Sequence, residues 1–141
     1  MARPVRGYTV MEHMGDLRLS LRAPTLGALF EVAGEALFDN LADGEVNLAP
    51  VACVRLAAAD GEALLVDWLN ELVYLHSVGG WLLRRFRVTM DGPTVLKAEV
   101  EGERFDTTRH QVRLEVKAAT FHRLSLHFEG GEWRAEVILD L

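Results

Sequence analysis

Cysteine, basic charge and long apolar runs are all scarce in this chain of 141 residues. Cys53 is the single cysteine, so neither an intramolecular disulfide nor a Cys/His zinc site can form, which suits a reducing cytosol. No segment approaches the roughly 18 apolar residues that span a membrane, and residues 1–7 lack the apolar run of a secretory signal. We therefore expect a cytoplasmic protein with no membrane partner.

The charge balance is also unlike that of an autonomous nucleic-acid binder. The chain has 15 Lys and Arg against 21 Asp and Glu, a net charge of -6, and Arg84-Arg85 is its only adjacent basic pair. Proteins that bind nucleic acid on their own usually carry a basic stripe that releases counterions from the phosphates. Any RNA involved in the function should therefore be held by a partner.

Signals for covalent catalysis and for phosphate loops are missing as well. The sequence has no Gly-x-Ser-x-Gly motif, and we expect Cys53 to be a buried, inert thiol in an apolar strand. Gly79-Gly80 follows an expected helix, whereas the glycines of a phosphate loop precede one. An enzyme with a covalent nucleophile is not favoured.

The apolar pattern predicts one α+β domain over residues 1–141. Half of the residues are apolar, which is enough for a hydrophobic core. Thr25 is the expected N-cap of a helix whose apolar stripe covers 26–37, and a turn should occupy 39–45. Asp60-Gly61 should open a second helix that ends near Ser77. Alternating apolar residues predict strands at 8–13, 16–21, 51–59, 86–90, 96–100, 112–116, 124–128 and 133–139. We expect a two-layer sandwich, with both helices packed on a mainly antiparallel sheet.

Segments spread over nearly the whole chain resemble the archease family. Glu12, His13 and Asp16 keep three positions of the family's first motif, Glu-His-Thr-Ala-Asp, while Met14-Gly15 replaces its middle pair. The resembling segments are residues 8–16, 29–33, 64–72, 102–103 with Asp106 and His110, 115–122 and 137–141.

The resemblance implies a function as well as an archease-like fold. Archeases are activators of RtcB-type tRNA-splicing RNA ligases, whose guanylylation and multiple turnover they promote. The chain is then expected to be a non-enzymatic cofactor protein in tRNA processing or RNA repair. It would meet RNA only indirectly, through the ligase.

The resemblance also implies an acidic site for a divalent metal ion. By position, its ligands would be Asp16, Asp140 and Leu141, the last through its backbone or terminal carboxylate. Hard cations such as Ca²⁺, Mg²⁺ or Mn²⁺ prefer these oxygens. The alternative is that Asp16 is a simple turn residue and Asp140 a solvated terminal one.

Lys117 and His13 are the expected contacts with the ligase or its nucleotide. Alternation of Val112, Leu114 and Val116 on a buried face would turn Lys117 outward, where it either meets phosphate or simply keeps the sheet soluble. His13 can position Asp16. The remaining histidines do not indicate a zinc site: His122 and His127 should lie on opposite faces of a strand, with His122 on the buried one, and we expect His110 in a loop and His76 at a helix C-terminus.

Two other functions stay open from sequence. A stand-alone metal-dependent enzyme acting on RNA or nucleotides would turn over without a partner. A general protein chaperone would suppress aggregation and would not depend on Asp16 or Asp140. The sequence does not determine the oligomeric state.

Overall fold

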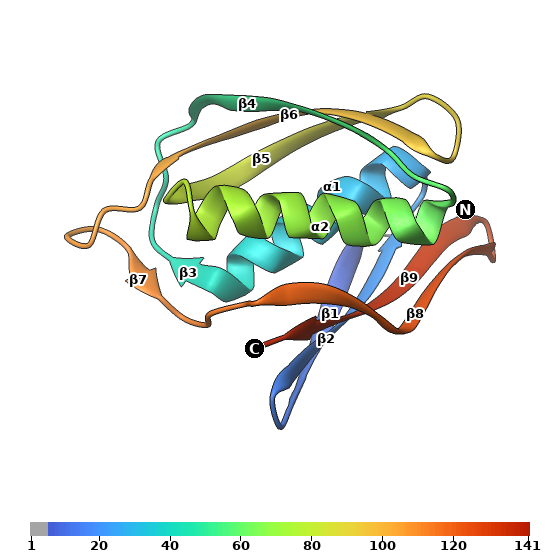
Figure 1. Ribbon diagram of the computed structural model, residues 1–141, viewed down its shortest axis with the longest axis horizontal. Coiled ribbons are helices and arrows are strands. Elements are labelled where there is room, and N and C mark those ends of the chain that lie inside the picture. The colour runs from blue at the N-terminus through green and yellow to red at the C-terminus, as the bar shows by residue number, and fades with distance from the viewer. Residues whose placement is uncertain (1–5) are drawn as a thin grey trace, which may run out of the picture.

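The computed structural model describes residues 6–141, which form two helices and nine strands (Figure 1). In chain order the elements are β1 (Gly7–His13), β2 (Asp16–Ala23), α1 (Leu26–Leu41), β3 (Ala42–Asp43), β4 (Ala49–Ala57), α2 (Gly61–Ser77), β5 (Trp81–Met90), β6 (Val95–Arg104), β7 (Gln111–Val112), β8 (Ala118–Glu129) and β9 (Glu132–Asp140).

The strands form three antiparallel sheets, and the helices lie between the two larger ones (Figure 1). One sheet has the order β1-β2-β9-β8, another β4-β6-β5, and a short third one pairs β3 with β7. The prediction of an α+β fold with two helices packed on antiparallel sheet is confirmed. The two larger sheets lie on opposite sides of the helices. α1 is apolar around most of its circumference, so each side of it has to be covered by a sheet.

Both helices begin at the predicted residues. The Thr25 side chain accepts a hydrogen bond from the Ala28 N–H at 3.2 Å, and the Asp60 carboxylate accepts one from the Ala63 N–H at 2.8 Å. These caps satisfy N–H groups that lack a partner within the helix. α1 continues to Leu41, so the turn predicted from residue 39 begins later than expected.

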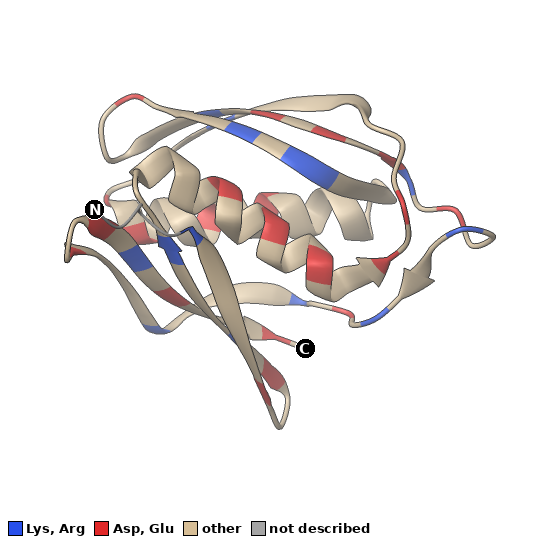
Figure 2. Ribbon diagram, turned by 180° about the vertical axis from the view of Figure 1, so that it is seen from behind, with Lys and Arg blue, Asp and Glu red and all other residues tan. Residues whose placement is uncertain are grey.

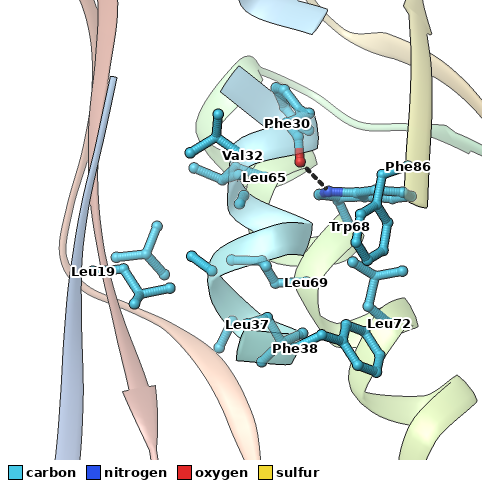
Figure 3. Close-up of a cluster of buried hydrophobic side chains, with 14 of the residues drawn as sticks. Leu19, Phe30, Val32, Leu37, Phe38, Leu65, Trp68, Leu69, Leu72 and Phe86 are labelled. Atoms are coloured by element: carbon cyan, nitrogen blue, oxygen red, sulfur yellow. Dashed lines mark hydrogen bonds between the residues drawn. The ribbon is translucent and has the colours of Figure 1, made fainter. Parts of the chain in front are cut away.

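The core is centred on the contact between the helices and β5 (Figure 3). Trp68 of α2 is fully buried, and its indole N–H donates a hydrogen bond to the Phe30 carbonyl of α1 at 2.9 Å. Its ring meets Phe86 edge-on, with centroids 6.2 Å apart. Gly34 allows β5 to come close, because a Cβ there would lie 2.8 Å from the Phe86 ring. These contacts hold both helices against the β4-β6-β5 sheet.

The other large sheet has one face toward the helices and one face outward. Leu17, Leu19 and Leu21 of β2 are buried against the helices. The residues between them therefore point to the outer face, since side chains alternate along a strand. Asp16 and Arg18 belong to this outer set.

Two local predictions are wrong. The strand expected over 112–116 is limited to the two residues of β7, and Val112 is 57% exposed. The segment that follows is bonded to the end of α1 and not to a sheet, because the Arg113 N–H donates to the Leu41 carbonyl at 2.8 Å. Cys53 is exposed, because it lies on the outward face of β4. Within residues 6–141, no helix has both the length and the apolar character needed to cross a membrane.

Candidate functional site

The predicted site residues converge at one end of the β1-β2-β9-β8 sheet. Asp16 of β2 is the register partner of His13 on β1 and of Asp140 on β9. The Leu141 N–H donates to the Gly15 carbonyl at 3.0 Å, and the Lys117 N–H donates to the Asp140 carbonyl at 2.8 Å. Main-chain pairing thus joins all five positions, and Figure 1 shows the C-terminal end of the chain beside the β1–β2 hairpin.

A two-residue turn fixes the position of Asp16. Met14-Gly15 connects the paired residues His13 and Asp16, and Gly15 has φ +83°. Tight hairpin turns require such positive φ values, which glycine adopts without steric penalty. The Met14 side chain is 92% exposed and contributes nothing to the turn. The departure from the family motif is therefore compatible with a well-formed hairpin.

Asp16 carries an unsatisfied buried oxygen. Its Oδ1 atom is shielded from solvent and has no hydrogen-bond partner within residues 6–141. A buried carboxylate oxygen without a partner is unfavourable, so a bound cation or donor at this point would stabilise it. Asp140 is directly opposite on β9, and paired residues on neighbouring strands direct their side chains to the same face.

The arrangement fits a hard divalent cation only if main-chain oxygens take part. Within the described residues, no cluster of three or more His, Cys, Asp or Glu side chains is placed to hold a metal ion. Asp16 and Asp140 supply two carboxylates, and the main chain of Leu141 lies next to them through its bond to Gly15. Such an oxygen set suits Ca²⁺ or Mg²⁺. The metal assignment stays a prediction.

Lys117 is next to this site through its backbone, and it also lines a neighbouring hollow. That hollow, of about 600 Å³, lies between the end of α2 and the segment before β8, and His76, Phe105 and Leu114 also line it. Lys117 is exposed, as predicted. Asp16 is not among the residues that line this hollow.

Asn70 is a positioning residue that sequence reasoning missed. Its Oδ1 accepts a hydrogen bond from the Ala119 N–H at 2.8 Å, and its amide donates to the Ala119 carbonyl at 3.3 Å. These bonds attach the start of β8 to α2 and so fix the backbone two residues after Lys117. The available signal in the sequence was the polar Asn70 among the apolar residues of α2.

A second hollow lies on the outer face of the sheet, between the hairpin and β8. It measures about 320 Å³ and is lined by Met11, His13, Asp16, Arg18, His122, Arg123 and Ile138. The prediction of a buried His122 is wrong, because the register of β8 on β9 shifts between Thr120 and Ser125 and breaks the simple alternation. The irregular segment directs His122 into this hollow.

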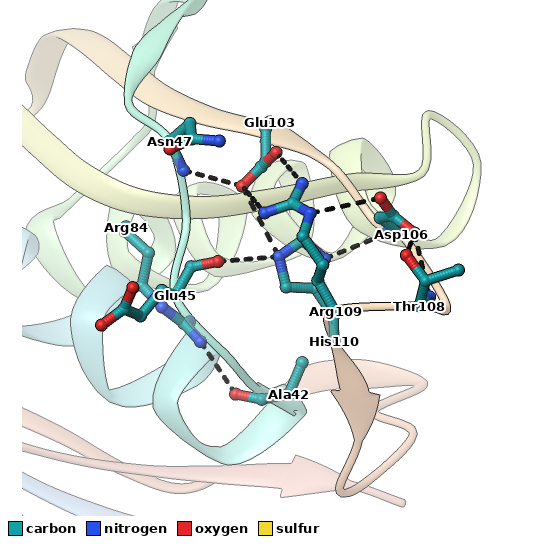
Figure 4. Close-up of polar contacts among 9 residues, drawn as sticks. All are labelled: Ala42, Glu45, Asn47, Arg84, Glu103, Asp106, Thr108, Arg109 and His110. Atoms are coloured by element: carbon teal, nitrogen blue, oxygen red, sulfur yellow. Dashed lines mark hydrogen bonds and ion pairs between the residues drawn. The ribbon is translucent and has the colours of Figure 1, made fainter.

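His110 lies in a loop, as predicted, but it is almost fully buried (Figure 4). Its Nδ1 accepts a hydrogen bond from the Asp106 N–H at 2.9 Å, so Nε2 carries the proton and donates to the Glu45 carbonyl at 2.9 Å. Glu103 accepts bonds from the Asn47 N–H at 2.7 Å and from Arg109. Hydrogen bonds from Arg109 hold the pKa of Glu103 below its usual range. This cluster joins the loop before β7 to the loop before β4.

Ion pairs cover much of the sheet's outer face. Arg18 pairs with Glu136, and Glu132 accepts from both Arg22 and Arg134. The Arg22 guanidinium, followed by Arg134, holds the pKa of Glu132 below its usual value. Figure 2 shows basic and acidic residues interspersed along the strands of residues 6–141.

Comparisons of the sequence and of the structure with known proteins both find archeases. The model of the Archease protein family matches residues 8–141. A protein archease of Methanosarcina acetivorans is 34% identical over 139 residues, which cover 95% of each chain. A protein archease of Pyrococcus furiosus is 30% identical over 142 residues, covering 97% of this chain and all of the relative.

Two solved structures share the fold. The solution structure of Methanobacterium thermoautotrophicum protein 1598 superposes with a TM-score of 0.79 at 28% identity, and covers 96% of this chain and 99% of its own. The crystal structure of a Thermotoga maritima protein, described as an archease and possible chaperone, has a TM-score of 0.66 at 20% identity, with 100% and 98% coverage.

Proposed function

This chain belongs to the archease family, and from that membership we propose that it activates an RtcB-type tRNA-splicing RNA ligase in the cytoplasm. It promotes guanylylation of the ligase and so sustains multiple turnover. The protein itself does not catalyse the joining reaction. It meets RNA only through the ligase, consistent with its net charge of -6.

One observation carries the proposal: the Oδ1 of Asp16, which has no hydrogen-bond partner among residues 6–141, lies beside the register partner Asp140. Two carboxylates on the same face of adjacent strands repel each other unless a cation lies between them or nearby. The main chain of Leu141, bonded to Gly15, brings a further oxygen to the same end of the sheet. The sheet thus concentrates acceptors where the hairpin and the last strand meet.

In the proposed mechanism, Asp16, Asp140 and Leu141 would hold a Ca²⁺, Mg²⁺ or Mn²⁺ ion at the surface that meets the ligase. When bound, such an ion would supply positive charge for the phosphates of the ligase's nucleotide. Lys117 donates hydrogen bonds from the adjacent hollow to a phosphate or to the ligase. His13, the register partner of Asp16, lines the same hollow and would help to position that carboxylate. Because Lys117 is bonded to the backbone of Asp140, the cation ligands and the lysine are presented together.

The test is GTP-dependent RNA joining by the cognate ligase under multiple-turnover conditions, with and without this protein. We expect stimulation that disappears with Asp16→Ala and with Asp140→Ala. Asp67→Ala, which removes an exposed carboxylate of α2, is the matched control and should stimulate as the native protein does. Absence of stimulation, with an active ligase, would exclude the activator function.

A general chaperone function is the second candidate, because apolar side chains are exposed near the hairpin. Met11, Met14 and Phe121 are 63%, 92% and 62% exposed. Exposed apolar groups of this kind bind unfolded chains or a specific partner. Suppression of aggregation of unrelated proteins, unchanged in Asp16→Ala, would favour the chaperone. Loss of ligase stimulation in the same variant would favour the activator.

A further inference from the structure

We propose that the 320 Å³ hollow on the outer face of the sheet binds the phosphate group of a small molecule, with Arg123 as its main ligand. The inference rests on the proposed cation site, because the cation offsets the negative charge of Asp16 beside the bound anion. It adds a ligand class and two ligand residues outside the cation site, Arg123 and His122, and it gives His13 a second role.

The backbone of β8 is distorted where it forms this hollow. Thr120 pairs with Ile138 and Ser125 pairs with Glu136, so four residues of β8 stand opposite the single residue Val137. Within the bulge, Arg123 has φ +53°, a left-handed conformation that is unfavourable for a residue with a side chain. Bulges redirect side chains next to functional sites, and strained residues gather there. The distortion turns both His122 and Arg123 toward the hairpin.

The side chains that line the hollow offer unused hydrogen-bond donors. None of the ion pairs among residues 6–141 involves Arg123, whereas Arg18 is paired with Glu136. A guanidinium brings five N–H donors, and each imidazole brings at least one. The donors come from β1 and β8, two separate walls of the same hollow.

This donor set fits an oxyanion better than a second metal ion. His13, His122 and Asp16 line the hollow together, yet within residues 6–141 they do not form a metal-ligand cluster. Convergent donors from several directions suit the tetrahedral oxygens of phosphate, for which arginine is the favoured partner. The volume is at the lower end of the range for ligand pockets, so a small phosphate compound fits.

The experiment follows backbone and side-chain NMR signals while glycerol 3-phosphate is added in the presence of Mg²⁺, with glycerol as the control that lacks phosphate. We expect shifts at His13, His122 and Arg123 with the phosphate compound only. Inorganic phosphate in a parallel titration distinguishes free phosphate from an ester as the source of the group.

Arg123→Gly is the decisive variant, because glycine accepts the positive φ that arginine adopts under strain. We expect the affinity for glycerol 3-phosphate to fall roughly tenfold or more, while Tm stays equal or rises and Mg²⁺ binding is unchanged. Arg55→Ala, an exposed arginine of β4, should change nothing. A lower Tm for Arg123→Gly would assign the residue to folding and contradict the inference.

Two results separate this inference from the proposed function. Mg²⁺ binding without phosphate binding, or phosphate binding that Arg123→Gly leaves unchanged, overturns the phosphate site and leaves the cation site standing. Absence of both Mg²⁺ and phosphate binding overturns both.

Discussion

Asp16 and Asp140 are paired across β2 and β9, one at the start of its strand and the other at the end. Residues separated by most of the chain thus direct two carboxylates to one face of one sheet. The pairing depends on the hairpin turn before Asp16 and on the strand β8, which covers the other edge of β9. Substitutions in those supporting elements should therefore change the site without touching its ligands.

Gly15→Ala should weaken ligase stimulation through the turn. A Cβ at Gly15 would meet no other atom, so the cost of the substitution comes only from the positive φ. This strain should lower the free energy of unfolding by about 1 kcal/mol. Gly92→Ala is the matched control, because Gly92 has φ +73° and open space in a hairpin on the other sheet. Thermal unfolding should show similar losses for both variants. Equal stimulation by both would contradict the role of the turn.

Asn70→Ala should loosen the start of β8. It removes both bonds to Ala119 and leaves a buried N–H without a partner, which destabilises by about 1–3 kcal/mol. Hydrogen exchange at the Ala119 amide should accelerate before that of the core, and ligase stimulation should fall. Asn40→Ala, which loses one bond to the Ala36 carbonyl within α1, is the comparison. If exchange at Ala119 is the same in both variants, Asn70 does not position β8.

Glu103→Gln should change the acid stability of the fold. Because Arg109 and the Asn47 N–H lower its pKa from 4.5 in the folded state, Glu103 stabilises the fold above that value. This contribution is lost as the pH falls through the lowered pKa. The native protein should therefore be more stable than the variant near neutral pH, and the difference should shrink below about pH 4.5. Denaturant unfolding at a series of pH values measures it, and a difference independent of pH would refute the linkage.

Tyr8 should ionise only in strong alkali. Burial, followed by the hydrogen bond that its hydroxyl donates to Asp39 at 2.7 Å, raises its pKa to about 12. Acidic residues recur along α1 (Figure 2), and the negative charges of Asp39 and Glu35 add to the rise. A raised pKa means that the stabilisation is complete below pH 10 and lost as the pH rises through about 12. Phenolate absorbance, with Tyr8→Phe as the reference, measures the value, and Asp39→Asn should lower it.

The helices, their caps and most strands were predictable because each follows a local rule. Thr25 and Asp60 are good caps, and Leu17, Leu19 and Leu21 alternate as a half-buried strand should. The positions that failed depend on distant contacts. Alternation placed His122 inside, but the bulge opposite Val137 reverses the order, and no local signal marks its three extra residues.

The sequence predicts the candidate site as a set of residues and not as a geometry, and the assignment of those residues stays a prediction. Family resemblance named Asp16, Asp140, Leu141, Lys117 and His13, and the register brings their backbones together. The sequence did not indicate that Lys117 lines a separate hollow. The path of the segment before Lys117 depends on hydrogen bonds to the distant Leu41 carbonyl, and strand alternation does not predict such bonds. No local signal in the sequence marked Arg123, since the role proposed for it follows from the backbone conformation of the bulge.

Calorimetric titration of the protein with Ca²⁺ and with Mg²⁺ tests the central claim most directly. The account predicts binding of one cation per chain by the native protein and by Asp67→Asn, and a loss of at least about tenfold in affinity for Asp16→Asn and for Asp140→Asn. Native-like binding by both Asp16→Asn and Asp140→Asn, or no binding by the native protein, would contradict it.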